Sequence, residues 1–177
     1  MQIVGFGVDD KTDGTGKAKI SWLMRDLLTT QHRMNATATN VDGWPATEMR
    51  AWLRDTILPT IDSSIRSHIV DVNKTYYNQT DKTTKISSDN IWLASTREMS
   101  GNTLLYESSG PDYTTLFTDN ASRIKKCSGT AQYYWLRTAY SSDEADFRFV
   151  YQDGHISNYS AIKANKVYGV CVGFCTD

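Results

Sequence analysis

Tyrosine, serine, asparagine and aspartate gather in the last third of the chain, where they could form a recognition surface. Six of the ten tyrosines fall between Tyr133 and Tyr168. Tyrosine offers a large, stiff contact area with a polar tip, whereas serine and asparagine offer adaptable hydrogen bonds; antibody loops use the same mixture. The chemistry that this composition predicts is binding. The candidate ligand contacts in the expected loops are Tyr140, Ser141, Ser142, Asp143, Asn158 and Tyr159.

The other tyrosines of this region have a simpler explanation. Tyr133, Tyr134, Tyr151 and Tyr168 fall in expected strands. A tyrosine in a strand is commonly half-buried with its hydroxyl in water. We therefore interpret these four as structural residues.

Trp135 and Arg137 complete the candidate ligand contacts, and two interpretations of them stay open. They are two residues apart and share one face of an expected strand. In the first interpretation, Trp135 is a stacking platform for a sugar and Arg137 is a clamp for an anion. In the second, Trp135 is buried and Arg137 pairs with an acid such as Asp146 or Glu98.

The residues that catalysis would need are not arranged for it. The sequence has no nucleophile–base–acid set, no glycine-rich phosphate loop and no cluster with metal-ligand spacing. Asp9 to Lys19 is rich in acids, but Lys11 falls where a calcium loop would need an oxygen ligand. His68 has no nearby acid or nucleophile in the sequence. We expect no enzyme activity, no metal and no cofactor.

Short apolar blocks bounded by glycine and polar clusters predict the antiparallel strands that would position these residues. The predicted strands are residues 2–8, 20–28, 70–76, 91–94, 133–138, 146–151 and 168–174. The stretches between them, including 78–90 and 101–123, are predicted to be loops. Because aromatic residues are scattered through these loops and can fix them to the core, we expect them to be ordered and to bind.

Three helices are predicted. From 45 to 58, apolar residues recur at three- and four-residue spacing, and Pro59 ends the pattern. A second, shorter helix is predicted over 61–69. Ser95 and Glu98 form the pattern of a capping box, which predicts that a strand passes directly into a third short helix.

Length and charge exclude several classes of protein. With 177 residues, 40% of them hydrophobic and 22% charged, the chain has the composition of one soluble globular domain. A net charge of −1 disfavours nucleic acid as a partner. No run approaches the ~20 apolar residues that cross a bilayer, so we expect no membrane insertion. The first residues lack the basic and apolar regions of a secretory signal.

Several blocks of the sequence, in their order and spacing, resemble an uncharacterised domain family of bacteria and their phages. The blocks are residues 43–53 with 57–59, 69–74, 91–98, 134–138 and 169–174. That family looks like a branch of the C-type-lectin-like fold, in the version shared with formylglycine-generating enzymes and phage tropism determinants. The resemblance implies an α+β fold in which two helices pack on twisted antiparallel strands, with long ordered loops and termini that lie together. It implies a single C-type-lectin-like domain over residues 1–177.

The resemblance also implies a receptor-binding surface in the last third of the chain, as in phage proteins of this fold. The sugar-binding signatures of calcium-dependent lectins are absent, so calcium-mediated sugar binding is not implied. Cys171 and Cys175 do not recreate the copper-binding cysteine pair of the formylglycine-generating enzymes. Enzyme activity is therefore not implied either.

These observations favour a phage virion protein of the tail or surface, assembled in the host cytoplasm, that binds a protein or glycan receptor on a bacterial surface. A homotrimer, or contact with other virion subunits, would fit that use. The alternative is a carbohydrate-binding module on a bacterial surface or secreted from the cell. An enzyme related to sulfatase-modifying factors is the least favoured hypothesis.

Overall fold

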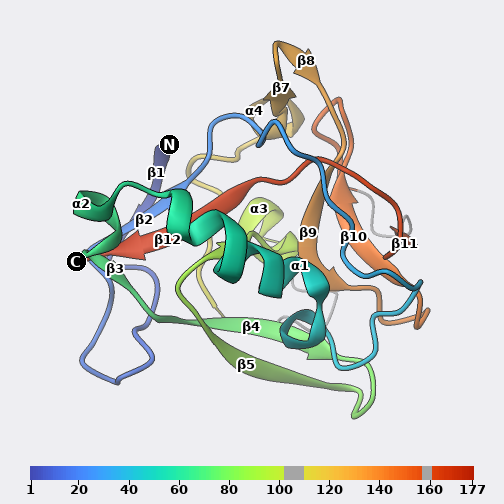
Figure 1. Ribbon diagram of the computed structural model, residues 1–177, viewed down its shortest axis with the longest axis horizontal. Coiled ribbons are helices and arrows are strands. Elements are labelled where there is room, and N and C mark those ends of the chain that lie inside the picture. Colours follow the sequence, from blue (N-terminus) through green and yellow to red (C-terminus); the bar gives the residue numbers. More distant parts are fainter. Residues whose placement is uncertain (102–109, 157–160) are drawn as a thin grey trace.

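Short antiparallel strands dominate the computed structural model, which describes residues 1–101, 110–156 and 161–177 (Figure 1). The strands are β1 (Gln2–Phe6), β2 (Ile20–Leu23), β3 (Ile69–Val70), β4 (Val72–Asn78), β5 (Thr83–Asp89), β6 (Trp92–Leu93), β7 (Lys126–Cys127), β8 (Thr130–Ala131), β9 (Tyr134–Ala139), β10 (Asp146–Val150), β11 (Ile162–Lys163) and β12 (Val172–Thr176). The α-helices are α1 (Glu48–Trp52), α2 (Ser63–Arg66), α3 (Thr96–Ser100) and α4 (Asn120–Arg123). The expected α+β class is confirmed. Within the described ranges, no helix is long and apolar enough to cross a membrane.

The last strand of the chain organises the largest sheet. β12 pairs antiparallel with β2, β3 and β6, and β1 lies outside β2 (Figure 1). Gly173 faces Leu23 on one side and Trp92 on the other. A Cβ at Gly173 would lie 2.2 Å from the Trp92 ring, so this packing needs glycine. The two chain ends lie together, since Met1 and Asp177 line one surface hollow.

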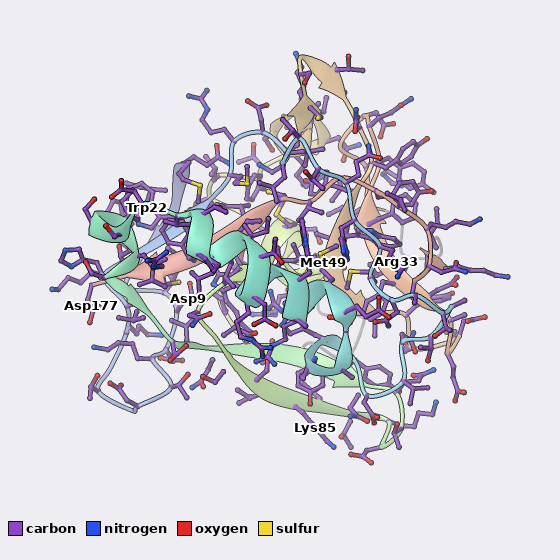
Figure 2. All side chains as sticks on the ribbon, in the orientation of Figure 1. Asp9, Trp22, Arg33, Met49, Lys85 and Asp177 are labelled. Carbon is purple, nitrogen blue, oxygen red and sulfur yellow. The ribbon has the colours of Figure 1, made fainter. Side chains whose placement is uncertain are left out.

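The predicted helix at 45–58 is present, with an irregular second half. Thr47 caps α1 by accepting a hydrogen bond from the Arg50 backbone N–H at 3.1 Å. α1 continues into a π turn (Leu53–Ile57) and a 3-10 turn (Leu58–Thr60). Pro59 is accommodated in that last turn, because a proline at the start of a turn has no N–H to satisfy. The buried Met49 side chain lies near the centre of the view in Figure 2.

The second predicted helix is much shorter than expected. α2 is a single turn, and Ile69 lies in β3 instead of in a helix. The third prediction is confirmed: Ser95 accepts from the Glu98 N–H at 3.2 Å, and Glu98 accepts from the Ser95 N–H at 2.7 Å.

The prediction that residues 78–90 are a loop is wrong. β5 pairs with β4 along its whole length, from Val72 opposite Asp89 to Asn78 opposite Thr83. Most β5 side chains are exposed, so the strand has no apolar face and its sequence lacks the alternation that marks a half-buried strand. Its threonines and isoleucine fit a strand by propensity alone.

A second sheet, of strands β11, β10 and β9, is drawn mainly in orange at the right of Figure 1. Within it, Phe149 lies opposite Trp135 and Val150 opposite Tyr134. The chain before β12 joins this sheet, because Gly169 donates a hydrogen bond to the Tyr133 carbonyl at 3.0 Å and accepts one from Trp135 at 3.1 Å. This contact fixes the segment before β12 beside the start of β9.

Candidate functional site

The second sheet carries a hollow of about 530 Å³ with mostly aromatic walls. It is lined by Tyr133, Tyr140, Asp146, Phe149, Tyr151, Ala161, Ile162 and Tyr168. Four of these are half-buried tyrosines, which offer ring surface and hydroxyl groups at once. A concave site with aromatic walls and a few polar groups is the usual form of a ligand pocket.

Strand register explains why the rings gather there. Tyr133 and Trp135 are two residues apart, as are Phe149 and Tyr151, so each pair shares a face. Because Trp135 lies opposite Phe149, the two pairs fall on the same side of the β9–β10 ribbon. The Gly169 contact then brings Tyr168 against them.

The rings form a packed cluster. The Tyr133 ring centre lies 5.9 Å from that of Phe149 and 5.6 Å from those of Tyr151 and Tyr168. Phe149 and Tyr151 are 4.7 Å apart. Tilted pairs at such distances stabilise one another by about 0.5–1.5 kcal/mol beyond the burial of their area. The cluster is therefore a pre-formed wall, and a ligand would contact its open side.

Asn40 fixes the loop that follows β9. Its amide nitrogen donates to the backbone carbonyls of Tyr140, Asp143 and Asp146, at 3.0, 2.7 and 2.6 Å. Asn40 is completely buried. One side chain thus holds both ends and the middle of the loop on which Tyr140 lies. Residues 31–42 fall between the predicted strands and helices, so the sequence does not reveal this role of Asn40.

Asp146 is the carboxylate of the hollow. It is partly exposed, and no described cation forms an ion pair with it. Partial burial raises the pKa of Asp146 above its ordinary value of 3.8, and Asp143 raises it further, whereas Lys163 opposes the change. The Asp146 carboxylate therefore lines the hollow while only partly hydrated, and it has no ion-pair partner among the described residues.

The structure brings part of the predicted contact set to the hollow. Tyr140 lines it, and Ser142 and Asp143 are exposed on the adjoining loop. Ser141 is half-buried, and its carbonyl accepts a hydrogen bond from Gln79 at 3.2 Å. Asn158 and Tyr159 lie outside the described residues.

The tyrosines interpreted as structural divide into two groups. Tyr133, Tyr151 and Tyr168 line the hollow, whereas Tyr134 is buried and its hydroxyl donates to the Arg123 carbonyl at 2.8 Å. The two-residue spacing of Tyr133 with Trp135, and of Phe149 with Tyr151, was the signal in the sequence that could have found this face.

Trp135 and Arg137 do not reach the surface, so their interpretation as a sugar platform and an anion clamp is wrong. Both are completely buried. The Trp135 ring nitrogen donates to the His32 carbonyl at 2.9 Å, and its ring lies 5.1 Å from Tyr168. Trp135 therefore supports the aromatic wall from behind. Arg137 pairs with Glu98, as in the second interpretation, through contacts of 2.5 and 3.0 Å.

Arg137 belongs to a buried ionic network centred on Lys74. The Lys74 ammonium donates to Asp9 at 2.6 Å, to Glu98 at 3.0 Å and to the Tyr113 hydroxyl at 3.0 Å. Its nitrogen also lies 3.5 Å from the centre of the Trp92 ring. Lys74, Arg137, Asp9 and Glu98 together carry balanced charge. A buried charge is tolerated when it is paired and fully hydrogen-bonded, as here.

The network holds its carboxylates ionised. Burial would raise the pKa of Asp9, but the charge and hydrogen bond of Lys74 outweigh it and leave the pKa below 3.8. Burial likewise opposes ionisation of Glu98, and Arg137 and Lys74 lower its pKa below 4.5. For Lys74, the two carboxylates overcome burial and raise its pKa above 10.5. Because all four charged side chains are buried, we assign the network to folding.

In the part of the chain that the structure describes, no three histidine, cysteine or acidic residues are grouped so that they could hold a metal ion. Searches of curated proteins and of solved structures found no match. A family model does match residues 20–176, which include every strand from β2 to β12 and all lining residues of the hollow. That model is described as a domain of unknown function, DUF6273. The chain belongs to the DUF6273 family.

Proposed function

We propose that this protein is a non-catalytic recognition domain that binds a receptor on a bacterial surface through the aromatic hollow. The observation that carries the proposal is the meeting of Tyr133, Tyr140, Tyr151 and Tyr168 around one concavity of about 530 Å³. Half-exposed tyrosines offer apolar area and hydrogen bonds with little loss of side-chain entropy.

The energetics suit a ligand of modest size. Each ~40 Å² of aromatic surface that a ligand covers would contribute roughly 1 kcal/mol to binding. The packed rings and the Asn40 anchor mean that little ordering accompanies binding, and pre-organisation of this kind raises affinity.

We further propose that the fold is C-type-lectin-like. The support is an antiparallel sheet centred on the last strand, chain ends that line one hollow, and long connections. The second helix is a single turn, which departs from the expected pair of helices.

For the biological setting, we propose a phage tail or surface protein assembled in the host cytoplasm, acting alone, as a homotrimer or with other virion subunits. A carbohydrate-binding module of a bacterial surface or secreted protein is the alternative, favoured by the same exposed rings.

The test is a pull-down of the purified protein on a panel of bacterial cell envelopes. The wild type is compared with a Tyr140→Ala/Tyr151→Ala double variant. Phe6→Ala is the matched control, because Phe6 is 69% exposed and lies on β1, away from the hollow's lining. We expect envelope binding that the double variant loses and Phe6→Ala keeps. Binding that survives in the double variant would contradict the proposed site.

A further inference from the structure

The charged groups around the aromatic hollow favour one kind of ligand. Asp146 is the charged residue among the described lining residues. Asp143 lies close enough to raise its pKa, and Lys163, opposite Asp146 in the β10–β11 pair, partly offsets it. Asp146 is thus the carboxylate that lines the hollow, with one further carboxylate and one ammonium close enough to influence it.

Arg148 is the other cation of this region, and it stacks on Tyr140, one of the rings that line the hollow. It is completely buried in β10, and its guanidinium carbon lies 4.3 Å from the centre of the Tyr140 ring. It does not line the hollow.

The aromatic walls have the same electrostatic preference as the carboxylate. The face of a tyrosine or phenylalanine ring is negative and attracts cations, by about 0.5 kcal/mol when exposed and ~2 kcal/mol when desolvated. The rings of the cluster are 4.7–6.0 Å apart, too close for a group to enter between them. A bound group would therefore lie on the open side of the cluster, in the space that Asp146 also borders.

We infer that the hollow selects ligands that carry an ammonium group, with the charge beside Asp146 and the attached carbons against the tyrosine rings. This rests on the proposed function and names the chemistry that the receptor presents there. An ammonium ion fits both the Asp146 carboxylate and the ring faces. A neutral group satisfies the rings alone, and an anion is repelled by both.

The ammonium could belong to an amino sugar or to a substituted alkyl chain, and small probes separate charge from shape. The first pair is choline and 3,3-dimethylbutan-1-ol, which have the same shape with and without the charge. The second is glucosamine and glucose, and acetate is the anionic probe. Binding of each is measured by ligand-observed NMR on the full chain, for the wild type, Asp146→Asn and Asp26→Asn. Asp26 is an exposed carboxylate outside the hollow's lining, so its variant makes the same charge change elsewhere.

We expect at least one cationic probe to bind about tenfold or more tightly than its neutral partner, a difference of ~1.4 kcal/mol. Asp146→Asn should remove that preference and Asp26→Asn should keep it. Preference for choline over glucosamine would indicate a substituted alkyl ammonium, and the reverse an amino sugar.

Equal binding of cationic and neutral probes, or tighter binding of acetate, would overturn the inference. So would the absence of binding by every probe. If the envelope pull-down still depends on Tyr140 and Tyr151 in those cases, the proposed function stands and the ammonium chemistry fails. If the pull-down itself is indifferent to those tyrosines, the proposed site fails.

Discussion

Lys74 and Asp9 form a completely buried ion pair, with Nζ 2.6 Å from Oδ1, although 65 residues separate them in the chain. The same ammonium binds Glu98, which binds Arg137 in turn, so β4, α3 and β9 meet the loop after β1 through four charges. This arrangement fixes β9, which Tyr133 precedes and Tyr140 follows directly in the chain.

Lys74→Met should destabilise the protein by about 3–5 kcal/mol, because it leaves two buried carboxylates with one remaining cation. Urea unfolding followed by circular dichroism measures the change. Lys85→Met is the control: Lys85 pairs with Asp81 at the outer edge of the molecule (Figure 2). The Lys85→Met change should have no measurable effect on stability. A Lys74→Met protein as stable as the wild type would contradict the assignment of the network to folding.

Stability should fall in acid. Asp9 and Glu98 have folded-state pKa values below their ordinary 3.8 and 4.5, so their contribution is present above those values. It is lost as pH falls from about 4.5 through the lower folded-state pKa values, because the unfolded chain then binds more protons. Thermal unfolding measured between pH 6 and 2 tests this. A melting temperature that stays constant below pH 4 would contradict the expected loss of stability in acid.

At the opposite end of the scale, Lys74 has a raised pKa, so its contribution is present below its ordinary value of 10.5. It is lost only as pH rises through the higher folded-state value. Unfolding by urea at pH 7, 9 and 10 should therefore show no loss from this group. A loss of stability near pH 9 that disappears in Lys74→Met would show that the pKa is lowered instead.

Asn40→Ala should weaken ligand binding although Asn40 does not line the hollow. Three backbone carbonyls of residues 140–146 lose the Asn40 donor. Those of Tyr140 and Asp146 keep a backbone donor within the loop, whereas the Asp143 carbonyl has no other donor among the described residues, and an acceptor left unpaired costs about 1–3 kcal/mol. Hydrogen exchange should accelerate at residues 140–146, with weaker envelope binding. Asn165→Ala, at an exposed position, is the control. Unchanged exchange in that loop would refute the anchoring role.

Gly169→Ala should disturb the aromatic wall from its backbone. A Cβ there would lie 2.8 Å from the Tyr133 carbonyl oxygen and 2.5 Å from a Leu27 methyl carbon. Such overpacking costs about 1–3 kcal/mol and would push Tyr133 and Tyr168 apart. Near-ultraviolet circular dichroism and envelope binding should both change. Gly129→Ala, where φ is +84° and nothing lies within 4 Å, should lower stability and leave binding intact.

The sequence by itself determined the local elements of this protein. Apolar blocks marked β2, β9 and β10, and the residues Ser95 and Glu98 marked the start of α3, because these signals lie within a few residues of the structure they specify. Loop composition also led to Tyr140, which does line the hollow. The sequence did not predict β5, because both of its faces carry polar side chains and no alternation of apolar residues marks it.

Tertiary structure alone decided which residues are surface and which are core. For Arg137 the sequence left open both an anion clamp and a pair with an acid, and the buried contact with Glu98, 39 residues away, decides for the pair. The sequence suggested that Tyr133 and Tyr168 are structural residues. In the structure, the backbone hydrogen bonds of Gly169 bring their rings together in one wall of the hollow. Burial of a charge and assembly of a pocket depend on partners that are distant in the chain. The periodicity of apolar residues within one segment does not identify those partners.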